Sequence, residues 1–334
     1  MKQGGFPERI WRSRLGRALV LVAILVLLAT IRRQDPPPPP PAAGAGTIVA
    51  TPIAFDPADP ARRRAGALVF LAGWTLVSAD DRFGGISAMH VENGAVTAIS
   101  DVGVMIRFPV PGARRRLPVR FDPFVEGPGR RTRKSNRDTE GLLVDGDRLW
   151  VTFERHNMVW RYDRASLRAL SSARPPPMRR WRGNSGPEAL VRLADGRFLV
   201  LAEGRDDGGT LSDAALFAGD PSLQGTPVRA LAYRRPAGFR ATDAALLPDG
   251  RILILNRRFS LFGGWAARLV IVEPDFGQTI VGRVVAMLEA PLAVDNMEAL
   301  SVTREGGRTI VWLASDDNFS PMQQTLLLRF ELVG

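Results

Sequence analysis

Acidic side chains stand at both ends of a predicted hairpin near the C-terminus. Glu298 precedes a run of β-forming residues, Gly306 and Gly307 form a turn signal, and the second run ends at Asp316 and Asp317. Antiparallel strands joined by a short turn return to the end at which they began. We therefore expect the carboxylates of Glu298 and Asp316 to be neighbours in space.

The same order of acid, strand, turn and strand recurs upstream. Five copies are visible, at residues 83–101, 140–154, 188–203, 242–257 and 298–316. The last four begin 48, 54 and 56 residues apart, which suits a four-stranded propeller blade and is too long for leucine-rich or ankyrin repeats. The repeat predicts an all-β fold, a β-propeller of five or six four-stranded blades. A β-sandwich is the competing fold, but it does not predict repeated copies.

If each copy is the inner hairpin of a blade, its first and last residues open onto the same mouth of a central channel. The acids expected there are Asp101, Glu140, Glu154, Glu188, Glu203, Asp243, Glu298, Asp316 and Asp317, with Asn184, Asn296 and Asn318 beside them. The alternative is a structural role, in which these acids cap strand ends or pair with neighbouring arginines. Such surface ion pairs stabilise the fold by about 0–1 kcal/mol each.

Carboxylates gathered around one axis repel one another unless they share a cation or a proton. Because the chain has no cysteine and only His90 and His156, a metal would need oxygen ligands, and a hard divalent cation such as Ca²⁺ fits that requirement. The candidate metal ligands are Asp101, Glu140, Glu188, Glu298, Asp316 and Asp317.

Arginines flank the acids, and this points to an anionic substrate. A metal held by carboxylates would polarise phosphoryl oxygens, and a guanidinium would neutralise charge in the transition state. Glu188, Glu298 and Asp316 are the candidate catalytic acids or bases, and Arg257 is the candidate phosphate contact. A basic loop at 130–134 could recruit an anion or could simply be solvated.

Composition and charge limit the possible classes of function. The 334 residues are 45% hydrophobic, which allows a large core. The net charge of +11 is concentrated at the start, where residues 1–33 carry seven cations and one acid. The remaining +5 is spread without a basic motif, so the sequence argues against nucleic-acid binding.

The N-terminal residues predict export. Residues 18–31 are almost entirely apolar and follow an arginine-rich lead, as in a signal anchor or a cleaved signal peptide. We favour an uncleaved anchor at 1–33 with the N-terminus in the cytoplasm, and a buried helix of a soluble domain is the other alternative. Residues 34–46 are rich in proline, alanine and glycine and predict a linker, so the globular domain is expected at 47–334.

Short strands separated by turn residues continue from residue 47 to the end. The run at 67–71 is expected to close the ring by completing the blade that contains 298–316 and 326–331. A sixth blade could lie in the irregular residues 204–238. The two histidines and the tryptophans are interpreted as structural residues.

Several segments together resemble the bacterial family described as esterase-like activity of phytase. They are Phe83-Gly-Gly-Ile-Ser87, Glu140-Gly141, Asp295-Asn-Met-Glu298 and Ser315-Asp-Asp-Asn-Phe319. The resemblance covers roughly residues 65–332 and implies an exported, propeller-like domain whose recurring acids carry a phosphodiesterase-like or esterase-like activity. Thr242-Asp243 departs from the family's Glu-Gly pattern in the fourth copy.

These observations together predict a membrane-tethered phosphoesterase of the bacterial inner membrane, with the propeller in the periplasm and Ca²⁺ at an acidic mouth. Its partner would be a small phosphate ester or another ester. The alternatives are a propeller without catalytic activity that binds a ligand or protein at the cell envelope, and a metal-dependent propeller of the lactonase type. Secretion after cleavage is the alternative location.

Overall fold

The computed structural model describes residues 43–131, 133–183, 185–204 and 209–334. These residues form an all-β fold, and its three short helices are 3-10 turns: η1 Lys134–Asn136, η2 Glu154–His156 and η3 Pro177–Arg180. The predicted anchor and most of the predicted linker lie outside the described residues. Within those ranges no helix is long and apolar enough to cross a membrane.

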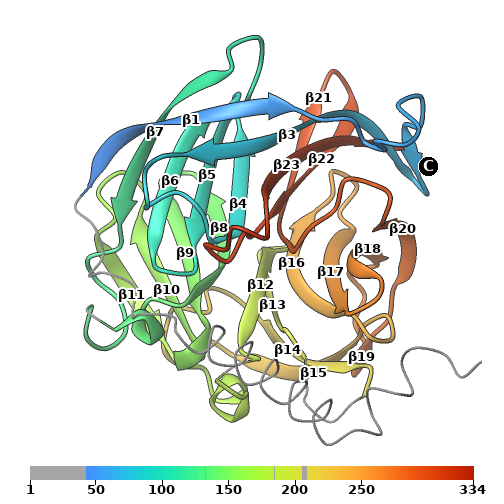
Figure 1. Ribbon diagram of the computed structural model, residues 1–334. Coiled ribbons are helices and arrows are strands. Elements are labelled where there is room, and N and C mark those ends of the chain that lie inside the picture. Colours follow the sequence, from blue (N-terminus) through green and yellow to red (C-terminus); the bar gives the residue numbers. More distant parts are fainter. Residues whose placement is uncertain (1–42, 132, 184, 205–208) are drawn as a thin grey trace, which may run out of the picture. The chain divides into compact units, whose positions relative to one another are not determined.

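The chain folds into five antiparallel units of four strands each (Figure 1). The first unit contains β4 Ile86–Glu92, β5 Ala95–Ser100, β6 Val104–Pro109 and β7 Arg116–Pro123. The second contains β8 Thr139–Asp145, β9 Arg148–Phe153, β10 Met158–Asp163 and β11 Ala169–Ala173. The third contains β12 Pro187–Arg192, β13 Phe198–Ala202, β14 Leu211–Phe217 and β15 Val228–Arg234, with β19 Thr279–Ile280 added in parallel.

The fourth unit contains β16 Arg240–Leu246, β17 Ile252–Ser260, β18 Gly264–Val272 and β20 Arg283–Glu289. The fifth is made of β21 Met297–Glu305, β22 Arg308–Ser315, β23 Thr325–Leu332 and the N-terminal strand β3 Leu68–Ser78. β3 pairs with β23 along its length, so the predicted closure by the N-terminal run is confirmed.

Two further strands join β3. β2 Arg64–Ala65 forms a short pair with it, and β1 Gly44–Pro52 lies between β3 and β7. β1 begins three residues before the expected start of the globular domain. It links the outer strands of the first and fifth units into one continuous sheet, which strengthens the junction where the ring closes.

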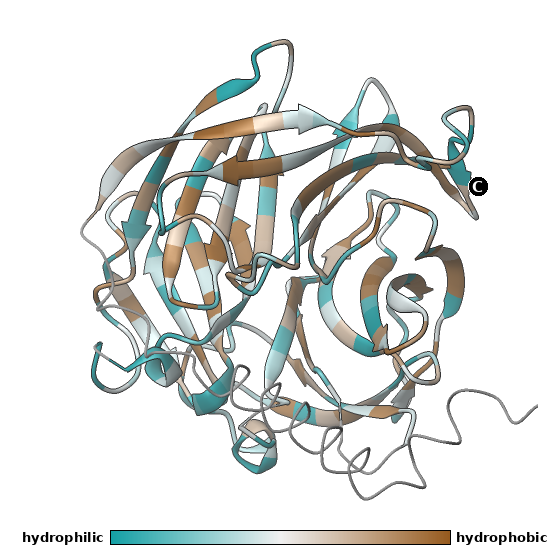
Figure 2. Ribbon diagram, in the orientation of Figure 1, coloured by the Kyte–Doolittle hydropathy of each residue, from teal (hydrophilic) through white to brown (hydrophobic). Residues whose placement is uncertain are grey.

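The first strands of the five units contact one another in a closed cycle, in the order β4, β8, β12, β16 and β21. Each of the five hydrophobic clusters lies between two neighbouring units; Trp312, for example, packs between the fifth and the first. Figure 2 shows the apolar residues running along these strands. The described residues therefore have a propeller-like arrangement, with a core divided among five interfaces.

Residues 204–238 do not form a sixth unit in the part of the chain that the structure describes. They contain β14 and β15, the outer strands of the third unit. The sequence there is irregular because the connections around these strands are long, not because an additional repeat is present.

Candidate functional site

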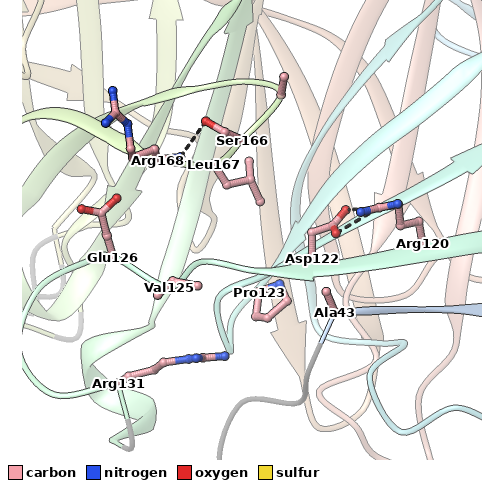
Figure 3. Close-up of a pocket in the computed structure, with 11 residues that line it drawn as sticks. Ala43, Arg120, Asp122, Pro123, Val125, Glu126, Arg131, Ser166, Leu167 and Arg168 are labelled. Atoms are coloured by element: carbon pink, nitrogen blue, oxygen red, sulfur yellow. Dashed lines mark hydrogen bonds and ion pairs between the residues drawn. The ribbon is translucent and has the colours of Figure 1, made fainter.

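The most voluminous groove that we describe lies away from the predicted acids. It has a volume of about 660 Å³ and runs beside β7, with Glu126, Arg131 and the ion pair of Arg120 with Asp122 among its lining residues (Figure 3). None of the predicted site residues lines it. The candidate site is therefore defined by the convergence of side chains at the channel mouth.

A β-bulge interrupts the first strand of every unit near its start. The register shifts occur at Ile86/Ala88, Thr139/Leu142, Pro187/Ala189, Ala241/Asp243 and Met297/Ala299. A bulge leaves one residue out of the ladder and re-aims its side chain. The residues skipped in this way include Glu140, Glu188 and Glu298, with Ser87 and Thr242 in the first and fourth units. We call this the bulge position.

Close packing of the inner strands accompanies the bulges. A Cβ atom at Gly141 would lie 2.6 Å from the carbonyl oxygen of Glu188, so a side chain cannot be placed there without moving β12. The glycine that follows Glu140 thus allows the second and third units to approach each other. This approach brings two bulge-position glutamates towards the same axis.

The second strand of each unit ends beside the bulge position of the same unit. We call the residue at that end the strand-end position. From the first unit to the fifth it is occupied by Asp101, Glu154, Glu203, Arg257 and Asp316. Four of these five residues are acids, whereas the fourth unit supplies Arg257. The fourth unit has an acid neither at the bulge position, which is Thr242, nor at the strand-end position. This agrees with the Thr242-Asp243 sequence that replaces Glu-Gly in the fourth copy.

The prediction for the C-terminal hairpin is confirmed. Met297 pairs with Ser315, and the amide of Asp316 donates a hydrogen bond of 2.9 Å to the carbonyl of Asn296. Glu298 and Asp316 therefore lie at the same end of the hairpin, and the charge of Glu298 contributes to raising the pKa of Asp316.

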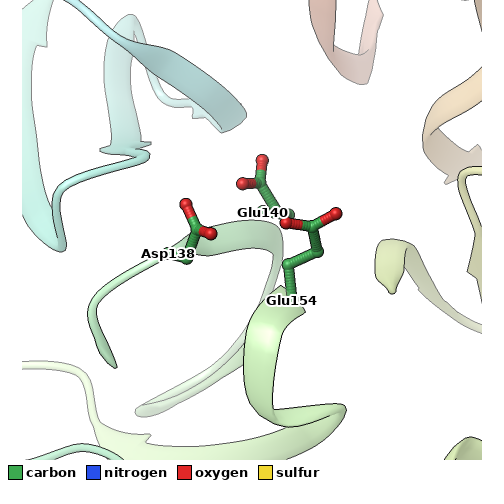
Figure 4. A group of neighbouring side chains, drawn as sticks. All are labelled: Asp138, Glu140 and Glu154. Carbon is green, nitrogen blue, oxygen red and sulfur yellow. The ribbon is translucent and has the colours of Figure 1, made fainter. Parts of the chain in front are cut away.

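Three carboxylates meet most closely in the second unit. Oxygens of Asp138, Glu140 and Glu154 lie within 4.8 Å of one another. Figure 4 shows the three side chains gathered between the start of β8 and η2. Three carboxylate oxygens at this spacing could supply part of the oxygen shell of a hard divalent cation.

Burial and mutual repulsion raise the pKa of the mouth acids. Burial is the largest cause in each case, and neighbouring carboxylates add to it. The pKa of Glu154 rises to about 8, and those of Glu140, Glu188 and Asp316 rise well above their usual range. A bound cation or a shared proton would relieve this repulsion.

Four cations border the acids. Arg257 forms an ion pair with Glu298 at 2.7 Å and donates a hydrogen bond of 3.3 Å to Glu203, and Arg240 contacts Glu203 at 2.7 Å. Burial raises the pKa of Glu298 to about 7 although Arg257 opposes the shift. The cationic side of the mouth is thus the fourth unit, and Arg257 is already engaged by two carboxylates.

The other two cations border the first and second units. Lys134 lies 2.6 Å from Asp101, and Arg155 lies 2.8 Å from Asp138. The second carboxylate oxygen of Asp101 is buried without a hydrogen-bond partner among the described residues. Such an orphaned oxygen is costly unless an unseen cation or water satisfies it, so it also fits a metal site.

Two predicted mouth acids have structural roles. Asp317 accepts hydrogen bonds from the amides of Gly85 and Phe319 and from the hydroxyl of Thr325. Asp243 accepts from the amides of Ala244 and Leu300, which links the fourth and fifth units. Both carboxylates are satisfied by protein donors.

Some predicted neighbours fall elsewhere. Asn184 lies outside the described residues. Asn296 has a buried side-chain oxygen without a protein partner among those described, close to Glu298. Arg137 follows the basic loop at 130–134; it is buried and donates to the carbonyls of Pro128 and Val125, which precede that loop.

A model of the phytase-like family, described as esterase-like activity of phytase, matches residues 81–319. The chain belongs to this family. The matched range starts just before the Phe83-Gly-Gly-Ile-Ser87 segment and ends with Phe319, so it contains every residue of the candidate site. No curated protein matches the chain.

Solved structures resemble this phytase-like chain only distantly. Glutaminyl cyclase of Myxococcus xanthus is 13% identical, with 80% of this chain and 97% of that one covered and a TM-score of 0.47. A chain of a nidogen/laminin complex is 11% identical, covering 85% and 96%, with a TM-score of 0.42. An α-L-arabinofuranosidase of Clostridium thermocellum is 9% identical, covering 68% and 80%, also at 0.42.

Sequence reasoning missed Asp138 and Arg240. Each stands immediately before or at the start of a first strand, and the backbone of Asp138 accepts the hydrogen bond from the amide of Glu154. Asp138 could have been found from its place two residues before Glu140, because alternate residues of a strand share a face. Nothing in the sequence marks Arg240 as a partner of Glu203.

Proposed function

We propose that this chain is a five-bladed β-propeller that hydrolyses phosphate esters, with phosphodiesters as the preferred class, at its acidic mouth. The observation that carries the proposal is the approach of Asp138, Glu140 and Glu154 within 4.8 Å, on the same mouth as Arg240 and Arg257. Membership of the phytase-like family supports a hydrolase acting on esters.

Asp138, Glu140 and Glu154 would hold the divalent cation, for which we propose Ca²⁺. Asp101 would add a ligand through its orphaned oxygen. When bound, the cation supplies positive charge that polarises a phosphoryl oxygen. Asp317 does not belong to this set, because protein donors satisfy its carboxylate.

The other mouth residues would transfer protons during hydrolysis and neutralise the negative charge of the ester. Water adds to phosphorus, the bond to the leaving oxygen breaks, and that oxygen takes up a proton. Glu188 would donate it, because burial and four neighbouring carboxylates raise its pKa well above the usual range. Glu298, whose pKa is raised to about 7, would accept the proton of the attacking water.

Hydrolysis by the full-length protein tests the proposal. We expect release of nitrophenol from bis(p-nitrophenyl) phosphate in the presence of Ca²⁺, and a loss of at least 100-fold in kcat for Glu188→Gln. Asp147→Asn is the matched control, since Asp147 is an exposed acid in the β8–β9 turn at the far end of the same unit. Hydrolysis of a lactone but of no phosphate ester would select the lactonase alternative.

We propose that residues 18–31 anchor the chain in the inner membrane with the propeller in the periplasm. The apolar run and its arginine-rich lead support this location. Protease added to spheroplasts should digest the propeller while the chain sediments with membranes. Recovery of the intact chain from the cytosol would reject the proposal.

A further inference from the structure

The hairpin between β17 and β18 extends beyond the rest of the fourth unit at the mouth end. The last pair between β16 and β17 is Arg240 with Arg257, whereas β17 and β18 remain paired as far as Ser260 with Gly264. The outer strand β20 reaches only as far as Ala266 on this hairpin. The segment 259–265 therefore projects past its neighbouring strands.

The projecting segment is apolar. Phe262 is 100% exposed and Leu261 is 83% exposed, and Phe259 packs against Trp265 at 4.9 Å between ring centroids. A hairpin tip in water is normally polar, because a fully exposed leucine and phenylalanine gain nothing from folding. The aromatic pair behind the tip holds it in place.

A second apolar side chain lies on the same face of the molecule. Met322 is 92% exposed in the connection between β22 and β23, which starts at the mouth acid Asp316. Phe262, Met322 and Leu261 are the three most exposed large apolar side chains of the described residues. All three lie in connections between the second and third strands of a unit, which open at the mouth.

Exposed cations share this face. The connection from β7 to β8 leads to the mouth and carries Arg130 and Arg133, and the connection from β11 to β12 carries Arg179 and Arg180; all four are exposed. The mouth acids, in contrast, are mostly buried. Glu126 on the β7–β8 connection and Asp81 on the β3–β4 connection are exposed acids of the same face, but the four arginines outnumber them. The accessible charge of these connections is therefore net positive around two projecting apolar elements.

We propose that this face binds the surface of an anionic phospholipid bilayer, with Leu261 and Phe262 inserted between the lipids. Apolar tips that enter the interface and arginines that contact anionic headgroups are the two elements that such binding requires. Charge complementarity favours a bilayer over an apolar protein partner, because the arginines on two separate connections would meet a planar anionic surface together. The mouth would then face the membrane.

The absence of cysteine allows a direct test on the full-length chain. A single Phe262→Cys variant labelled with nitrobenzoxadiazole is reconstituted with vesicles of phosphatidylglycerol and phosphatidylcholine. We expect a blue shift and at least a threefold loss of quenching by aqueous iodide relative to vesicles of phosphatidylcholine alone. Val281→Cys is the matched control, since Val281 is an exposed apolar residue between β19 and β20 at the opposite end of the fourth unit.

Two outcomes would overturn the inference. One is a label at position 262 that iodide quenches equally on both kinds of vesicle, although the chain sediments with them. The other is equal protection at 262 and 281, which would indicate nonspecific adsorption. The double variant Arg179→Glu/Arg180→Glu should reduce the protection at 262 while leaving ester hydrolysis in solution unchanged.

Discussion

The residue at the bulge position sets the chemical character of each unit at the mouth. Glutamate occupies it in the second, third and fifth units, whereas serine and threonine occupy it in the first and fourth. Arg257 stands at the strand-end position of the fourth unit, where the other units carry an acid. One unit therefore neutralises part of the charge that the others accumulate.

Removing Arg257 should make Glu298 a weaker acid. Arg257 opposes the effect of burial on Glu298, so we expect Arg257→Gln to raise the pKa of Glu298 above about 7. Carbon-detected NMR titration of the glutamate carboxyl groups measures this change. Arg251→Gln, which breaks an ion pair in the turn at the far end of the same unit, should leave the pKa of Glu298 where it is.

Stability without metal should fall as the pH rises. Glu154 and Glu298 have folded-state pKa values of about 8 and about 7 against ordinary values of 4.5. Between pH 4.5 and the folded-state pKa of each group, the folded state holds a proton that the unfolded chain has released. The free energy of unfolding therefore decreases as the pH rises through this range. In EDTA, Tm should be lower at pH 8.5 than at pH 5.5, and Ca²⁺ should restore it at the higher pH.

The matched variant for this pH effect is Glu154→Gln, which carries no titrating group at that position. Its Tm in EDTA should depend less on pH than that of the wild type. A wild-type Tm that stays constant from pH 5 to pH 8, or that rises, would contradict the raised pKa values of the mouth acids.

At the scale of strands, polar side chains join the inner strands of neighbouring units. Thr152 accepts a hydrogen bond of 2.6 Å from the amide of Gly141 and donates one of 2.8 Å to the carbonyl of Pro187. Thr139 and Ser301 form comparable links to Ser100 and Val91. The two bonds of Thr152 hold the bulge at Glu140, and the other two tie neighbouring units together.

Thr152→Val should destabilise the fold while keeping the side-chain volume. It leaves two buried backbone groups unpaired, each at a cost of about 1–3 kcal/mol. Equilibrium unfolding in urea should show a lower free energy of unfolding, and metal affinity should fall as well because Glu140 and Glu188 flank the site. Thr75→Val, at a half-buried threonine whose one hydrogen bond is 3.5 Å long and lies at the surface, should have little effect on either quantity.

The strands could be predicted from the sequence where apolar runs alternate with turn residues, and the closing strand β3 could be predicted from propeller topology. The bulges could not, because the shift of one residue depends on the approach of a neighbouring unit, as at Gly141. β1 was missed because its start, Gly44-Ala-Gly46, resembles a flexible linker; it becomes a strand through pairing with β7.

At the scale of the whole molecule, the repeat predicted that the acids converge but not how they divide into groups. Asp317 and Asp243 follow the pattern of the repeat, yet backbone amides from other units satisfy them. Asp138 lies outside the repeat and joins the closest group of carboxylates. Which acid binds a proton, an amide or a cation depends on contacts between units, and these are set by the ring as a whole.

The ring also places the apolar hairpin tip and the acids on one face. A chain tethered through its N-terminal residues and bound through this face would meet its ester substrate at the membrane surface. The two proposals are separable, because hydrolysis of a soluble diester does not require the tip and vesicle binding does not require the acids.

The affinity of the mouth for Ca²⁺ tests the central claim most directly. Isothermal titration calorimetry on the metal-free, full-length protein at pH 7.5 should show one tight site per chain, weakened at least tenfold in Glu140→Gln and unchanged in Asp147→Asn. Equal binding by the wild type and Glu140→Gln, or no binding of Ca²⁺ or any other divalent cation by the wild type, would contradict the account.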